Sequence, residues 1–102
     1  MDFIDIHGAS ETAYRFRPWP QSGGHPPIAG NYVLVAAGTR TVMELGVLDD
    51  LSQARTLLSG RASDVHLFTR FNLARRDREA EHVDMAMQHP EVRGSTLAEV
   101  AD

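Results

Sequence analysis

The chain has 102 residues, of which 42% are hydrophobic, and this length is typical of one domain with a modest core. It contains no cysteine, which excludes disulfides and thiolate zinc sites. Its net charge of −4 argues against the broad basic surface of a nucleic-acid-binding protein, so any contact with nucleic acid should be weak. No apolar run reaches the roughly 20 residues of a membrane span, and the N-terminus lacks the basic start of a signal peptide, so we expect no membrane contact and a cytoplasmic location.

The N-terminal part of the chain predicts a β-hairpin within residues 2–17. Residues 3–7 and 13–17 alternate apolar and polar side chains, as half-buried strands do. In the second segment, one face carries Tyr14 and Phe16, and the other carries Arg15 and Arg17.

A loop should follow, because residues 18–30 hold four prolines and three glycines, which exclude a helix. Trp19 is flanked by prolines in this loop, and tryptophan is common in interface hot spots. Loops longer than about 12 residues are uncommon unless they are functional or disordered. Trp19 is therefore a candidate contact for a protein partner; the alternative is that its indole covers the sheet.

Residues 31–36 and 41–47 predict a second hairpin with a glycine-containing turn. Apolar residues fall on both faces of the first of these segments, which indicates a central strand covered on both sides. Residues 65–71 alternate again and predict a further strand.

Two helices are expected between and after these strands. The first covers about 50–59, with an aspartate cap, and the second covers 73–89, capped by Asn72 and ended by Pro90. The inner stripe of the second helix is expected to be Leu73, Ala80, Val83 and Met87.

The expected order is β-β-loop-β-β-α-β-α. Antiparallel hairpins with only partial alternation of strands and helices predict an α+β fold with a small mixed or antiparallel sheet. We expect one globular domain over 1–90 and a C-terminal tail over 91–102.

Two glycine-containing triplets lie in the second predicted hairpin. GNY begins its first strand and ELG lies at the end of its second, and a proline-rich lead precedes GNY. The segment Leu48 to Leu51 follows and caps the first helix, and Glu81 lies before Pro90 on the second helix. In these features residues 26–90 resemble the core of the GIY-YIG nuclease domain, which places its metal-binding glutamate similarly.

The resemblance implies metal-assisted phosphodiester cleavage in active members, with a glutamate on a divalent ion, two tyrosines and an arginine on the first helix. Tyr32 matches the first tyrosine, and Glu81 matches the ligand for magnesium or manganese. Glu44 stands where the second tyrosine belongs and would repel a phosphate. Ala54 occupies the arginine position, with Arg55 next to it. Because losing one such donor typically costs about 10²–10³ in rate, a fold without activity is favoured.

The densest basic cluster is a second candidate contact surface. It comprises Arg70, Arg75, Arg76 and Arg78. Positive charges near the N-terminus of a helix interact unfavourably with the helix dipole. Contact with a phosphate or an acidic protein would explain why they lie there. The alternative is that Asp77, Glu79 and Glu81 neutralise it locally.

These observations favour a non-catalytic binding or interaction module without a cofactor, with a protein partner, as an inhibitor or accessory factor would have. One alternative is a magnesium- or manganese-dependent endonuclease that uses Tyr32, Arg55 and Glu81. The other is a domain that binds nucleic acid weakly and does not cleave it.

Overall fold

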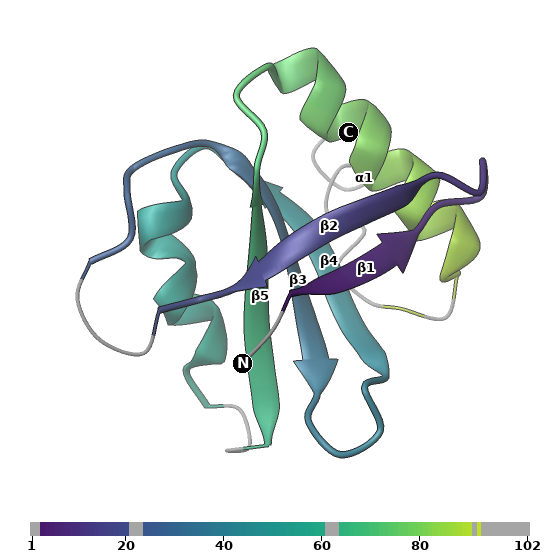
Figure 1. The fold of residues 1–102 in the computed structure, drawn as a ribbon. Coiled ribbons are helices and arrows are strands. Elements are labelled where there is room, and N and C mark those ends of the chain that lie inside the picture. The colour runs from purple at the N-terminus through teal and green to yellow at the C-terminus, as the bar shows by residue number, and fades with distance from the viewer. Residues whose placement is uncertain (1–2, 21–23, 61–63, 91, 93–102) are drawn as a thin grey trace.

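A computed structural model describes residues 3–20, 24–60, 64–90 and 92 of the chain (Figure 1). Five strands form one antiparallel sheet in the order β1-β2-β5-β3-β4, and two helices pack against it. In chain order the elements are β1 (Ile4–His7), β2 (Ala13–Pro18), β3 (Gly30–Ala36), β4 (Val42–Leu48), the 3₁₀ helix η1 (Leu51–Leu58), β5 (Val65–Phe71) and α1 (Arg75–Gln88). The α+β class and the predicted element order are confirmed.

The curled sheet is covered on both faces, and β3 is central to it. β3 pairs with β4 on one side and with β5 on the other. Alternate residues of β3 pack in a cluster with Met85 of α1 on one face and with Ala54 of η1 on the opposite face. The β3 residues are Val33 and Val35 on the α1 face, and Tyr32 and Leu34 on the η1 face. The predicted central strand is confirmed.

The glycines of the GNY and ELG triplets have a packing role. Gly46 lies opposite Tyr32 in the β3–β4 register, and a Cβ atom at Gly46 would collide with the Tyr32 ring. A Cβ atom at Gly30 would collide with the carbonyl oxygen of Arg70 on β5 and with Leu51 of η1. Both glycines therefore allow the close approach of neighbouring elements, whatever else the triplets do.

The first predicted helix is a 3₁₀ helix rather than an α-helix. Asp50 caps it and accepts hydrogen bonds from the backbone N–H of Ser52 at 2.9 Å and from the Ser52 hydroxyl at 2.5 Å. These bonds lower the pKa of the Asp50 carboxyl. The sequence predicted an aspartate cap for this helix, and Asp50 provides it.

The predicted inner stripe of the second helix is wrong. The side chains that α1 buries are Arg78, His82 and Met85, whereas Leu73, Val83 and Met87 are exposed. Asn72 does not cap the helix, because the N-cap residue is Ala74 and no side chain bonds there. The face that α1 turns toward the sheet is set by polar contacts of Arg78 and Asn72, described below, and not by the apolar residues of the helix.

The N-terminal hairpin joins the rest of the sheet through a short junction. β2 pairs with β5 only at Arg17–Thr69 and Pro18–Phe68, and β2 then diverges across β5 (Figure 1). The predicted tail 91–102 lies outside the described residues except for Val92, which packs against the α1-side core. Within the described residues, no helix combines the length and apolar character needed to cross a membrane.

Candidate binding groove

A groove with a volume of about 500 Å³ opens where β2 leaves β5. We call it the β2–β5 groove. Its lining residues are Arg15, Arg17, Pro18, Pro20, His25, Pro26, Thr69, Arg70 and Phe71. Strand alternation puts Arg15 and Arg17 on the same side of β2, opposite the buried Phe16, so both guanidinium groups stay at the surface. This volume is within the range of about 300–1,000 Å³ typical of ligand clefts.

Stacked rings build one wall of the groove. The indole of Trp19 stacks on the His25 ring with centroids 4.5 Å apart and planes 4° apart, and the His25 ring meets Phe71 edge-on at 5.4 Å. Trp19 is half-buried and packs against the η1-side core, so its indole supports the wall from behind. Phe71 is 53% exposed and faces any ligand directly.

Hydrogen bonds fix the orientation of the His25 ring. Its Nδ1 lies 2.8 Å from the carbonyl oxygen of Pro26, and its Nε2 lies 3.3 Å from the hydroxyl of Thr69. A carbonyl oxygen only accepts, so Nδ1 donates in the bond to Pro26. These two contacts hold His25 as a flat part of the wall.

Two of the three arginines in the groove already have carboxylate partners. Arg15 Nε lies 3.0 Å from Asp5 Oδ1, and its guanidinium lowers the pKa of the Asp5 carboxyl. Arg70 Nε lies 2.8 Å from Glu81 Oε1. Arg17 makes no hydrogen bond or ion pair with any described residue and is exposed. The groove therefore carries about one uncompensated positive charge.

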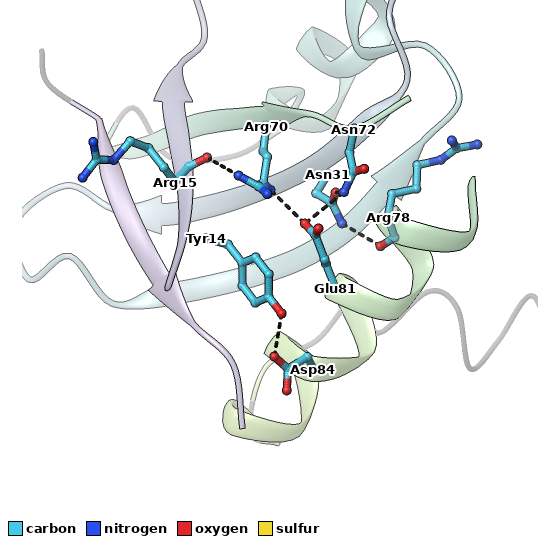
Figure 2. Close-up of polar contacts among 8 residues, drawn as sticks. All are labelled: Tyr14, Arg15, Asn31, Arg70, Asn72, Arg78, Glu81 and Asp84. Carbon is cyan, nitrogen blue, oxygen red and sulfur yellow. Dashed lines mark hydrogen bonds and ion pairs between the residues drawn. The ribbon is translucent and has the colours of Figure 1, made fainter. Parts of the chain in front are cut away.

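A polar network behind the groove ties α1 to the sheet (Figure 2). Glu81 reaches from α1 and accepts from Arg70 Nε and from Asn72 Nδ2 at 2.9 Å. Asn72 also donates to Asn31 Oδ1 at 3.0 Å, and Asn31 Nδ2 donates to the carbonyl oxygen of Arg78 at 2.9 Å. Glu81 is thus an acceptor that holds Arg70 and Asn72 in place.

The hairpin turn is fastened to the other end of α1 by Asp84. Its carboxylate accepts from the Tyr14 hydroxyl at 2.7 Å (Figure 2). It also accepts from the Ser10 backbone N–H at 2.9 Å and from the Ser10 hydroxyl at 2.6 Å. The Ser10 and Tyr14 hydroxyls lower the pKa of Asp84, and burial, followed by the bond to Asp84, raises the pKa of Tyr14. A side chain at Gly8 would collide with this carboxylate.

The residues that the nuclease resemblance singles out do not converge. Tyr32 packs on the η1 face and donates its hydroxyl to Glu44 Oε2 at 2.7 Å. Glu81 lies on α1, which covers the opposite face. Ala54 is buried against the same cluster as Tyr32, and Arg55 is exposed. Within the described part of the chain, no three His, Cys, Asp or Glu side chains gather as a metal site requires.

The basic cluster is divided among different roles. Arg75 pairs with Glu79 at 2.7 Å, four residues along α1. Arg78 is only 7% exposed and donates to Asp49 Oδ1 and to the Leu73 carbonyl, both at 3.0 Å, so it is a structural residue. Arg76 is exposed and bonds to no described residue, and Arg70 alone reaches the groove.

Most of the groove could not be predicted from the sequence. Strand alternation placed Arg15 and Arg17 on one face, but nothing in the sequence indicates that β2 pairs with β5. Trp19 was a candidate contact, whereas in the structure its indole stacks on His25 and Phe71 is the more exposed ring. Exposed arginines at alternate positions of a strand were the available signal.

Comparisons with known proteins gave no match to any protein-family model, curated protein or solved structure. The resemblance of residues 26–90 to a GIY-YIG core therefore stays a prediction.

Proposed function

We propose that this chain is a non-catalytic binding module, on a GIY-YIG-like core that has lost its active site, and that its partner is a protein presenting an acidic segment. The observation that carries this proposal is the β2–β5 groove, which joins exposed guanidinium groups to a wall of flat rings. Arginine and exposed aromatic rings are the side chains that dominate protein interfaces.

The charge distribution supports a protein partner over a nucleic acid. The groove has only one uncompensated arginine, Arg17, because Asp5 and Glu81 offset the other two. The whole chain carries a net charge of −4, so a phosphate backbone running beyond the groove would meet repulsion. A protein segment with one or two carboxylates matches this surface better.

The contacts of Tyr32 and Glu81 support a role without catalysis. Each already has a partner within the fold, Glu44 for the tyrosine and Arg70 with Asn72 for the glutamate. The two side chains also lie on opposite faces of the sheet. Both are accounted for by packing and by the attachment of α1.

Selection of peptides from a random display library on the immobilised protein tests the proposal. Amide shifts of the labelled protein should locate the selected peptides at β2, β5 and the ring wall, and Arg17→Gln should weaken binding. Arg76→Gln is the matched control, because it removes from α1 an exposed arginine that pairs with none of the described residues. Failure to select any peptide that perturbs the groove would contradict the proposal.

A further inference from the structure

The groove offers one guanidinium group that has no carboxylate partner among the described residues. Arg17 uses none of its donors on described residues, and its fork can hold both oxygens of a carboxylate. Arg15 has committed Nε and Nη2 to Asp5, and Arg70 has committed Nε to Glu81 and Nη1 to the Arg15 carbonyl at 3.4 Å. A second anionic group would meet guanidinium groups whose positive charge Asp5 and Glu81 already offset.

The apolar part of the groove consists of flat surfaces. Three proline rings, at positions 18, 20 and 26, line it together with the exposed ring of Phe71. Flat walls of this kind suit another ring, which can stack on them or meet them edge-on. The cationic and flat parts share one groove, so a ligand that fills it needs an anion and a ring close together.

We infer that the β2–β5 groove binds one side-chain carboxylate of a partner protein together with a neighbouring aromatic side chain, with Arg17 on the carboxylate and Phe71 on the ring. This inference rests on the proposed function and names the chemistry of its ligand. The volume of about 500 Å³ accommodates such a pair of side chains. A nucleotide offers the same pairing of ring and anion, but a phosphate carries more charge than the one uncompensated arginine balances.

A titration with small probes tests the inference. The probes are an acetylated, amidated Glu-Phe dipeptide, its Gln-Phe and Glu-Ala counterparts, and adenosine monophosphate, each followed by amide and arginine Nε–H shifts. Glu-Phe should perturb Arg17 and Phe71, and Gln-Phe should bind about 10- to 100-fold more weakly, because it loses a charge-assisted bond. Arg17→Gln should lose a similar factor, Arg17→Lys less, and Arg76→Gln none.

Several results would overturn the inference. Equal binding of Gln-Phe and Glu-Phe would remove the carboxylate from it, and equal binding of Glu-Ala would remove the ring. Tighter groove binding of adenosine monophosphate would assign the site to a phosphate ligand. If library peptides of other chemistry map to the groove, only the inference fails; if no peptide reaches the groove, the proposed function fails with it. Unchanged thermal unfolding of Arg17→Gln confirms that its effect is local.

Discussion

Replacement of His82 by leucine should stabilise this protein. The imidazole is 1% exposed on the inner face of α1, and neither ring nitrogen has a hydrogen-bond partner among the described residues. A buried polar group left without a partner costs about 1–3 kcal/mol, and a misfit of the new side chain costs up to about 1.5 kcal/mol. We therefore expect a net gain of about 1 kcal/mol at pH 8, which raises Tm by roughly 4–8 °C in a domain of this size.

The stability gained by His82→Leu should be larger at acidic pH. Burial lowers the pKa of His82 below its ordinary value of 6.5. The unfolded chain then binds a proton more readily than the folded one, so the free energy of unfolding of the wild type decreases as the pH falls below about 6.5, by up to about 1.4 kcal/mol per pH unit. The leucine variant lacks this loss.

Urea unfolding at pH 8 and pH 5.5, followed by circular dichroism, measures both effects. The difference in unfolding free energy between His82→Leu and wild type should widen at the lower pH. A leucine variant that is less stable at pH 8, or one whose difference from wild type is the same at both pH values, would refute this reasoning.

Three further changes follow from the described contacts. Gly46→Ala should lower the free energy of unfolding by about 1–3 kcal/mol, because the added Cβ atom collides with the Tyr32 ring. Tyr32→Leu in the same chain should recover part of that loss. Additive effects of the two changes in a double-mutant cycle would contradict this contact. Asp84→Ala should cost about 2–3 kcal/mol by removing the acceptor of three hydrogen bonds. Because the folded-state pKa of Asp84 is lowered, its contribution should disappear as the pH falls below about 3.8, so unfolding free energies of variant and wild type should converge there. Glu81→Gln should lower the unfolding free energy by about 1–2 kcal/mol, since Arg70 loses its carboxylate, and DNA incubated with manganese should stay intact with either protein; cleavage by wild type alone would support the nuclease alternative.

Local patterns predicted the strands well, because alternation reports directly which side of a strand is buried. The segment 65–71 matches β5, and the central place of β3 follows from its two apolar faces. The apolar pattern did not predict which face of α1 is buried. Its inner face holds Arg78 and His82, since contacts of Arg78 with Asp49 and Asn31 outweigh the apolar stripe.

The groove depends on long-range geometry that no local pattern encodes. Arg17 and Thr69 are neighbours because β2 pairs with β5 across about half of the chain. The partners of Tyr32 and Glu81 also lie on other elements of the fold. The spacing of the motifs therefore could not predict the hydrogen bonds of Tyr32 with Glu44 and of Glu81 with Arg70. What the sequence did contain was the alternation of Arg15 and Arg17.

The way the N-terminal hairpin is attached has a consequence for the order of folding. Its polar attachments, the β2–β5 junction and the bonds to Asp84, join it to residues much later in the chain, as does the packing of Ile6 and Phe16 in the core with Phe68 and Met85; Ser10 and Asp84 are separated by 74 positions. Closing such large loops is slow relative to forming the hairpin or the β3–β4 pair. We therefore expect the hairpin to dock onto the core after the β3–β4 pair has formed. A ligand that bridges Arg17 and Phe71 would span the β2–β5 junction and would stabilise the docked hairpin by mass action.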